Sequence, residues 1–195
     1  NDPETALAAE ALPLHADLPN LCYDQPQIKG DAEKALAAAA ASVSARFKTQ
    51  INHQAPLEPE ATIAYWEKDE AGDDQLVIIG RSINIHYHLG MLQSALGWEN
   101  MRYIEAFSVG QFGIKIDVIS EGIAGAAAIH FKRPVRYIPS IAESMLMTSK
   151  RHAFDMQVKL AADRDGRLTA YCNDFVVDNG AYHSIGHVVI YRALL

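Results

Sequence analysis

A loop with two glycines around a phenylalanine is the part of the sequence best suited to chemistry. In the stretch VGQFGIK, Gly110 and Gly113 flank Phe112, and Lys115 follows. Glycine has no Cβ, so it permits positive φ and lets another molecule lie against the main chain. We expect peptide N–H groups of this loop to donate hydrogen bonds to an oxo or phosphate oxygen, at the N-terminal end of the following helix. The alternative is a plain strand-to-helix turn in which the Phe112 ring plugs the core.

The histidines are the obvious candidates for metal ligands, but their spacing argues against that role. His86 and His88 are two residues apart on a predicted helix, so their side chains point about 200° apart. His183 and His187 share a helical face if that helix begins early enough, but no glutamate accompanies them as in the HExxH pattern. We therefore expect no metal ion that is ligated directly by side chains of this chain.

Nucleophilic and paired-carboxylate chemistry also have weak support in the sequence. No GxSxG elbow occurs, and Cys22 and Cys172 lie in strand-like surroundings, where we expect buried, unreactive thiols. Glu58 and Glu60 are close enough in the LEPE segment to act as paired carboxylates. The rigid Pro59 between them favours a structural bend with two solvated acids instead.

The pattern of apolar residues and breakers predicts mixed strands and helices around the glycine loop. Strands are predicted in SVSARFKTQIN, ATIAYWEK, QLVIIG, MRYIEAFSV, RPVRYIP and on both sides of a turn at Asp165-Gly166; helices are predicted from Ser82 to Gly97, from Val118 to Ile129, in IAESMLMT and in HSIGHVVIYRALL. We expect the first three strands to form a meander, and Ser82 to be the N-cap of the first of these helices. Without strict βαβ alternation, the pattern predicts an α+β fold with a sheet layer and a helix layer.

Composition limits the class of protein. The chain has 195 residues with 49% hydrophobic content, enough to bury a core, and its net charge of -7 argues against nucleic-acid binding. No apolar run approaches the roughly 20 residues that a membrane-spanning helix needs, and no secretory signal is recognisable. We expect a cytoplasmic protein, with a proline-rich, extended lead-in or linker over residues 1–20 and the domain itself over residues 21–195.

The order of several segments resembles a known enzyme family. These segments are HQAPLEPEATIAYW, LVIIGRSINIHYHLGMLQSALG, FSVGQFGIKID, RPVRYIPS, KRHAFDMQVKLAADRDGRLTAY and VVDNGAYHSIGHVVIYRALL. Over about residues 20–195 they resemble the molybdenum hydroxylases, the xanthine dehydrogenase and aldehyde oxidoreductase family, and in particular the bacterial aldehyde oxidoreductases. The resemblance implies the N-terminal part of a molybdopterin-binding domain, truncated at its C-terminus.

The resemblance assigns the glycine loop to the cofactor. It implies that Gly110, Gln111, Phe112 and Gly113 bind molybdopterin and that the main-chain N–H of Phe112 faces an oxygen or sulfur ligand of molybdenum. The phenyl ring would close one wall of the site and keep it dry, which strengthens the attraction between the amide and a negative ligand.

The resemblance also implies a substrate channel. Its predicted residues are Ile116, Ile185, Val188 and Arg192. Purine-oxidising members of the family carry a glutamate where Ile116 follows the loop lysine, so the substitution favours aldehydes over purines.

The implied activity is that of a larger parent enzyme. It would oxidise small aldehydes to carboxylic acids at a molybdopterin centre, with the pterin in its cytosine dinucleotide form and 2Fe–2S clusters in domains or subunits outside this chain. No catalytic residue is predicted within the chain, the isolated fragment is expected to be inactive, and a homodimer is a further expectation. Two alternatives stay open: an N-heterocycle (purine or nicotinate) hydroxylase of the same family, and a non-catalytic binding or interaction domain.

Overall fold

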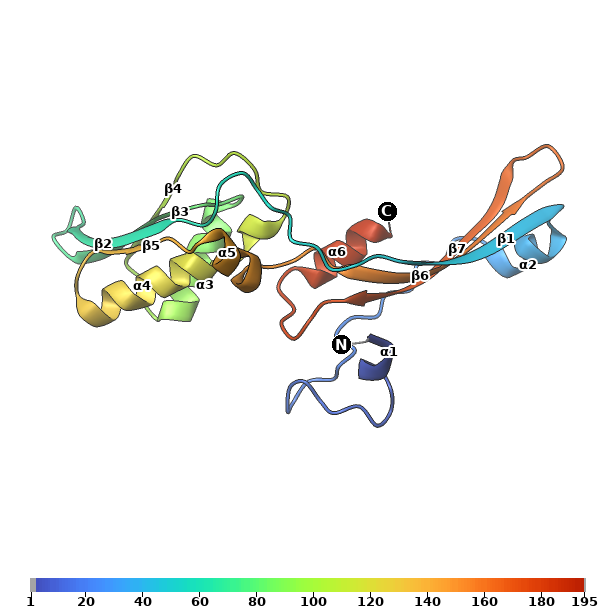
Figure 1. Cartoon of the computed structure of the whole chain (residues 1–195), viewed down its shortest axis with the longest axis horizontal. Helices are drawn as coiled ribbons and strands as arrows, with labels where there is room; N and C mark the ends of the chain where they lie inside the picture. The colour runs from blue at the N-terminus through green and yellow to red at the C-terminus, as the bar shows by residue number, and fades with distance from the viewer. Residues whose placement is uncertain (1–2, 195) are drawn as a thin grey trace. The chain divides into compact units, whose positions relative to one another are not determined.

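A computed structural model describes residues 3–194 of the chain, which divide into two compact units. One unit combines the residues up to Asn52 with those from His152 onward, and the other is continuous from His53 to Arg151 (Figure 1). We call them the discontinuous unit and the inserted unit. Residues 1–2 of the predicted lead-in and residue 195 of the predicted domain lie outside the described residues.

The discontinuous unit is built on a three-stranded antiparallel sheet in the order β1-β6-β7. Its elements are α1 (Pro3–Ala6), α2 (Ala32–Ala38), β1 (Ala41–Lys48), β6 (Ala153–Ala162), β7 (Leu168–Asp178) and α6 (Gly186–Ala193). The predicted hairpin is confirmed. Gly166 has a φ of 79°, and the Asp163 N–H donates to the Arg167 carbonyl at 3.0 Å to close the turn between β6 and β7.

The predicted meander is wrong in its first strand. β1 pairs with β6, in a register that runs from Ala41 opposite Ala162 to Lys48 opposite Asp155, and not with the next strand of the chain. Alternating apolar residues identify a strand but carry no information about its partner.

The inserted unit has a four-stranded sheet in the order β4-β3-β2-β5, in which β3 and β4 are parallel and the other pairs antiparallel. Its elements are β2 (Thr62–Lys68), β3 (Asp74–Gly80), α3 (Ile85–Leu96), β4 (Met101–Glu105), a 3-10 turn η1 (Ile114–Ile116), α4 (Ile119–Phe131), β5 (Val135–Tyr137) and α5 (Ile141–Met147). β2 and β3 form the hairpin that the sequence predicts.

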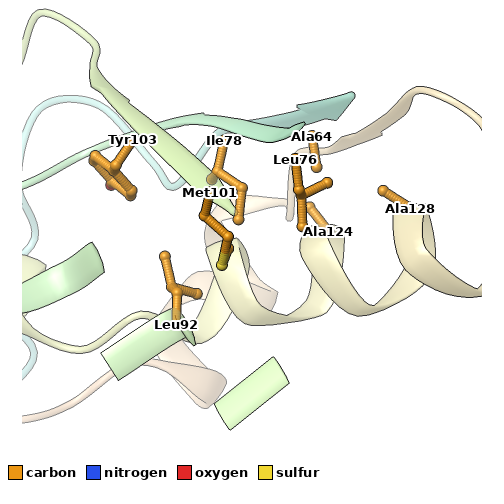
Figure 2. Close-up of a cluster of buried hydrophobic side chains, with 8 residues drawn as sticks. All are labelled: Ala64, Leu76, Ile78, Leu92, Met101, Tyr103, Ala124 and Ala128. Carbon is orange, nitrogen blue, oxygen red and sulfur yellow. The ribbon is translucent and has the colours of Figure 1, made fainter. Parts of the chain in front are cut away.

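The core of the inserted unit lies between its sheet and the helices α3 and α4, as Figure 2 shows. The buried side chains are Ala64, Leu76, Ile78, Leu92, Met101, Tyr103, Ala124 and Ala128. The small residues of α4 allow close packing: a Cβ on Gly125 would lie 2.6 Å from Leu96 Cδ1. This sheet-and-helix arrangement confirms the α+β prediction.

Helix α3 begins later than predicted. Ser82 is not its N-cap; the Asn84 side chain accepts the Tyr87 N–H at 3.2 Å, and the Ser82 hydroxyl instead accepts the Asn84 N–H at 2.9 Å. Ser82 thus fixes the residue that caps the helix. The predicted stop at Gly97 is confirmed by its φ of 63°.

Candidate functional site

The glycine loop connects β4 to η1 and has two consecutive residues in the left-handed region. Phe112 has a φ of 45° and Gly113 a φ of 89°. A non-glycine residue with positive φ is strained, and such strain is concentrated at functional sites. The Phe112 side chain is 70% exposed, so the alternative in which its ring plugs the core is wrong.

The hydrogen bonds of the loop leave two peptide donors free. The Gly113 N–H donates to Gln111 Oε1 at 2.7 Å, and the Ile114 N–H donates to the Gln111 carbonyl at 2.8 Å. Within residues 3–194, the N–H groups of Gln111 and Phe112 have no acceptor. Both residues are exposed, and peptide donors without an internal acceptor on an exposed loop suit an external oxygen or sulfur atom.

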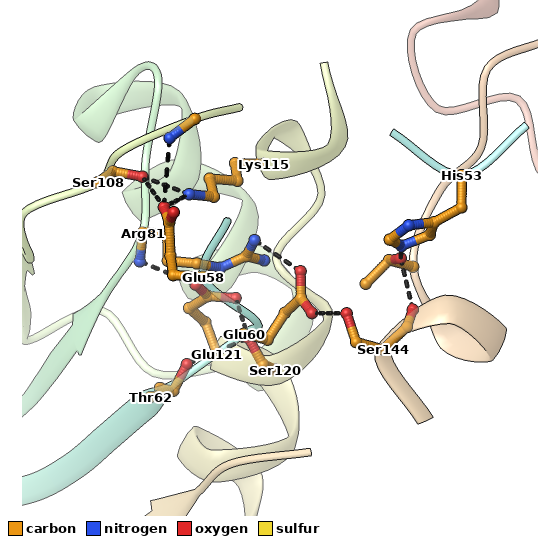
Figure 3. Close-up of polar contacts among 12 residues, drawn as sticks. His53, Glu58, Glu60, Thr62, Arg81, Ser108, Lys115, Ser120, Glu121 and Ser144 are labelled. Atoms are coloured by element: carbon orange, nitrogen blue, oxygen red, sulfur yellow. Dashed lines mark hydrogen bonds and ion pairs between the residues drawn. The ribbon is translucent and has the colours of Figure 1, made fainter. Parts of the chain in front are cut away.

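Glu58 holds the first half of the loop (Figure 3). Its Oε1 accepts the Val109 N–H at 2.9 Å, the Gly110 N–H at 3.5 Å and the Ser108 hydroxyl at 3.1 Å. Oε1 also accepts the Lys115 ammonium, which donates to Ser108 Oγ at 2.5 Å as well. The Lys115 side chain is fully buried, with 0% exposure. We call these contacts the Glu58–Ser108–Lys115 cluster.

Glu60 belongs to a second buried network (Figure 3). Its Oε1 lies 2.7 Å from Arg81 Nη1, and its Oε2 accepts the Ser144 hydroxyl. The Arg81 main chain is also held: its carbonyl accepts the Tyr103 hydroxyl at 2.6 Å and its N–H donates to Glu121 Oε1 at 3.2 Å. Burial, together with the nearby Glu121 carboxylate, raises the pKa of Tyr103 well above its usual range.

The prediction that Glu58 and Glu60 are solvated acids is therefore wrong. Pro59 does make a bend, but the bend sends one carboxylate to the Lys115 ammonium and the other to the Arg81 guanidinium. Two buried or half-buried charges near the loop are neutralised by this arrangement.

His88 lies beside the same network. It is fully buried on α3, and its ring meets that of Tyr103 edge to face, with centroids 5.8 Å apart and an interplanar angle of 85°. Burial lowers the pKa of His88, so the ring is neutral at pH 7. His86, two residues earlier, is exposed, which confirms that the two histidines point to different sides of α3.

An open depression of about 440 Å³ lies beside the loop. It is lined by Ser82, Glu105, Ser108, Val109, Gly110, Gln111 and Phe112. The loop therefore presents peptide donors and an aromatic ring next to a space that a ligand can enter. Such an arrangement can bind an anionic or oxo ligand through the main chain.

The predicted channel residues are divided between the two units. Ile116 ends η1 in the inserted unit and is half-buried, as are Ile185 and Val188 at the start of α6 in the discontinuous unit. Arg192 is exposed in the last turn of α6. The loop residues 110–113 and Ile116 are brought together in one unit, and the channel as a whole stays a prediction.

The prediction of buried thiols is wrong for Cys22. Cys22 is exposed, with its Sγ 3.4 Å from His183 Nδ1, whereas Cys172 is half-buried in β7. Helix α6 begins at Gly186, after His183, yet the His183 and His187 rings stack with Nε2 and Nδ1 3.0 Å apart. Among the residues that the structure describes, no three His, Cys, Asp or Glu side chains are grouped so that they could hold a metal ion.

Sequence reasoning missed the charged residues that hold the site. Lys115 follows the second glycine of the loop, and Glu58 and Glu60 flank Pro59. The sequence does not indicate that Glu58 pairs with Lys115, because the two residues are 57 positions apart. Arg81 directly follows the predicted strand QLVIIG and stands in one of the segments that carry the family resemblance, but neither observation predicts its ion pair with Glu60.

The fold and the loop define a cofactor-binding domain of known type. The family model described as the molybdopterin cofactor-binding domain matches residues 14–195, and the chain belongs to this family. The resemblance inferred from the sequence segments is thereby confirmed. The ligand that the family description names is the molybdopterin cofactor.

Individual relatives come from the same family. The chain is 32% identical over 191 residues to an aldehyde oxidoreductase of Megalodesulfovibrio gigas, covering 96% of this chain and 20% of the relative. It is 31% identical to the large molybdopterin subunit of a nicotinate dehydrogenase of Eubacterium barkeri, covering 97% of this chain and 44% of that subunit. The chain thus spans about a fifth of the first relative's length and less than half of the second's.

A solved structure agrees with this assignment. The aldehyde oxidoreductase from Desulfovibrio gigas superposes with a TM-score of 0.88 at 31% sequence identity, over 96% of this chain and 20% of that one. As a separate finding, none of the helices between residues 3 and 194 has the length and apolar character needed to cross a membrane.

Proposed function

We propose that this chain is part of the large subunit of a molybdenum hydroxylase that oxidises aldehydes to carboxylic acids. The observation that carries the proposal is the pair of peptide N–H groups at Gln111 and Phe112, which have no acceptor in residues 3–194 and lie on an exposed, strained loop beside a depression. Neutral donors of this kind fit an electronegative oxygen or sulfur ligand on a metal. The molybdenum cofactor, when bound, supplies the two-electron redox chemistry.

In this proposal the residues of this chain bind the cofactor and orient it. The N–H groups of Gln111 and Phe112 donate hydrogen bonds to the cofactor, and the Phe112 ring covers it on one side. An apolar wall excludes water, and a hydrogen bond to a charged ligand is stronger where water is excluded. The catalytic base and the electron outlet belong to parts of the parent protein outside this chain.

Aldehydes are the proposed substrates because the predicted channel residues Ile116, Ile185 and Val188 offer no hydrogen-bonding side chain. An N-heterocycle would leave its ring donors and acceptors unpaired against Ile116. A heterocycle hydroxylase is the second candidate, and the 31% identity to a nicotinate dehydrogenase subunit favours it. Arg192 suits either substrate class.

The remaining features of the parent enzyme follow from the same proposal. They are a pterin in the cytosine dinucleotide form, 2Fe–2S clusters in other domains or subunits, a cytoplasmic location and a homodimer. The substrate is a small aldehyde, and neither nucleic acid nor a membrane is a proposed partner.

The test is made on the full-length parent protein, purified from a host that synthesises the molybdenum cofactor. Metal analysis is expected to give about one molybdenum per large subunit, and turnover of benzaldehyde with a dye acceptor is expected to exceed turnover of xanthine and nicotinate. Faster oxidation of either heterocycle would overturn the choice of substrate. A well-folded preparation without molybdenum would instead support a non-catalytic domain.

A matched pair of variants tests the substrate assignment at one position. Ile116→Glu introduces the carboxylate that could hold a heterocycle, and Ile116→Val keeps the wall apolar. The ratio of benzaldehyde to heterocycle turnover is expected to fall by about tenfold or more in Ile116→Glu, which is the effect of pairing one buried polar group. The ratio should be unchanged in Ile116→Val, and an unchanged ratio in both variants would remove Ile116 from the channel.

A further inference from the structure

We propose that Glu58 and Lys115 are positioning residues that fix the glycine loop for the cofactor, an inference that rests on the proposed function. They act through the main chain of the loop, which Glu58 contacts directly. Four features of the Glu58–Ser108–Lys115 cluster carry the proposal: its position at both ends of the loop, the division of peptide donors, the burial of its charge and its electrical neutrality.

The cluster ties the loop at both of its ends. Ser108 stands at the start of the loop and Lys115 in η1 just after it, and both side chains contact Glu58, which comes from the segment before β2. The strained residue Phe112, with a φ of 45°, lies between these two anchors. A strained backbone persists only where its surroundings hold it. Here the two turn hydrogen bonds to Gln111 hold Phe112 locally, and the cluster fixes the chain on either side of them.

The cluster also determines which peptide donors are free. Glu58 takes up the N–H groups of Val109 and Gly110, at 2.9 and 3.5 Å, while those of Gln111 and Phe112 have no acceptor within the described chain. The donors therefore change from internal to external use between residues 110 and 111. If Glu58 released the loop, Val109 and Gly110 would also be available and the external donors would lose their fixed position.

A buried ion pair is a poor way to gain stability at this point. The Lys115 side chain has 0% exposure, and burying an ammonium beside a carboxylate stabilises a fold little compared with apolar residues of the same volume. The pair instead fixes the orientation of the Glu58 carboxylate. The ammonium donates to both Glu58 and Ser108, and this fixes the carboxylate that in turn holds the peptide groups.

The neutrality of the pair matters for an anionic cofactor. Glu58 is in direct contact with the loop, and its negative charge alone would oppose a phosphate or an oxo ligand on the other side of the same peptide groups. Lys115 cancels that charge. We therefore expect Lys115→Met to weaken cofactor retention more than Glu58→Gln does, since only the first leaves a net negative charge behind the loop.

The experiment uses the full-length parent protein with four variants: Glu58→Gln, Lys115→Met, the double variant, and Ser108→Ala as a smaller change. Glu67→Gln, in a surface ion pair with Arg102 at 2.7 Å, is the control for a change of charge in the same unit. Glu60→Gln is the control for loss of a buried ion pair that has no contact with the loop.

The first measurement is hydrogen exchange of the peptide covering residues 107–116 in cofactor-free protein. Exchange at Val109 and Gly110 is expected to quicken by about tenfold or more in Glu58→Gln and Lys115→Met, by less in Ser108→Ala, and not at all in Glu67→Gln. This measurement does not depend on the enzymatic activity. Exchange equal to that of wild type in the first two variants would overturn the proposal.

The second measurement is molybdenum content and aldehyde turnover in the loaded protein. Both variants of the ion pair are expected to lose at least about tenfold in kcat, with molybdenum content falling most in Lys115→Met and recovering in the double variant. Losses no larger than those of Glu60→Gln at equal loss of thermal stability would show a merely structural role. If wild type holds no molybdenum and oxidises no aldehyde, the proposed function fails, and the exchange result still decides whether the cluster holds the loop.

Discussion

Removing either member of the buried Glu60–Arg81 ion pair should destabilise the inserted unit strongly. The two side chains are 0% and 5% exposed, and Glu60 Oε1 lies 2.7 Å from Arg81 Nη1. Loss of one partner leaves the other as an unpaired charge in the interior, which costs about 3–5 kcal/mol. Glu60→Gln keeps the shape and an oxygen for Ser144 but leaves the guanidinium unpaired; Arg81→Met leaves the carboxylate unpaired.

The double variant Glu60→Gln/Arg81→Met should recover much of this loss because it contains no unpaired charge. We expect the two substitutions to be coupled by about 2 kcal/mol or more, so the double variant is more stable than the sum of the single losses predicts. With a urea m-value of about 2 kcal/mol per molar, a loss of about 4 kcal/mol lowers the urea midpoint by about 2 M.

Tryptophan fluorescence during urea unfolding reports on the inserted unit, which contains the ion pair. The sequence has 2 tryptophans, Trp66 and Trp98, and both lie in the inserted unit with ring centroids 4.9 Å apart. Glu67→Gln removes one partner of a solvent-exposed ion pair, in which Arg102 is 50% and Glu67 30% exposed, and should change the midpoint little. The reasoning is refuted if each single variant costs under about 1 kcal/mol, or if the double variant loses the full sum.

Two further predictions concern the same buried network. Because burial lowers the pKa of His88, the unfolded state takes up a proton more readily than the folded state, and the urea midpoint of wild type should fall as the pH drops below about 6.5. His88→Phe should show a smaller fall over the same range. Parallel pH profiles would contradict the lowered pKa of His88. Gly80→Ala would place a Cβ 2.7 Å from Glu121 Oε1 and 2.8 Å from the Tyr103 hydroxyl, and should lower the free energy of unfolding in urea by about 1–3 kcal/mol. The control Gly90→Ala has nothing within 4 Å of its Cβ and should not destabilise the protein. Equal urea midpoints for the two variants would show that the buried network adjusts to the methyl group without loss of stability.

The local features of the fold could be predicted from the sequence because they depend on neighbouring residues. Gly97 ends α3 and the Asp165-Gly166 turn joins β6 to β7, as their conformational preferences require. The choice of Asn84 over Ser82 as N-cap could not be predicted, since either side chain can cap a helix. Strand pairing failed for a different reason: the partner of β1 is determined by tertiary packing, which the alternation of apolar residues does not encode.

The sequence predicts the main-chain loop of the candidate site but not the buried ion pairs that hold it. The glycines marked a loop with positive φ, and that conformation occurs at Gly113 and, beyond the prediction, at Phe112. The acids of the LEPE segment were expected in solvent because a proline bend normally lies at the surface. Burial of Glu58 and Glu60 requires Lys115 and Arg81 at specific distances in space, which a single sequence does not report.

The pairing of β1 with β6 has a consequence for synthesis on the ribosome. The Arg46 side chain of β1 donates to Asp155 of β6, which lies 109 residues later in the chain. β1 therefore emerges long before the strand that completes its hydrogen bonds. The inserted unit can collapse around its own core before β6 is made, and until then β1 is an unpaired strand exposed to other nascent chains. Slow translation just before residue 153 would prolong that exposure, and a chaperone that shields the waiting strand would raise the yield.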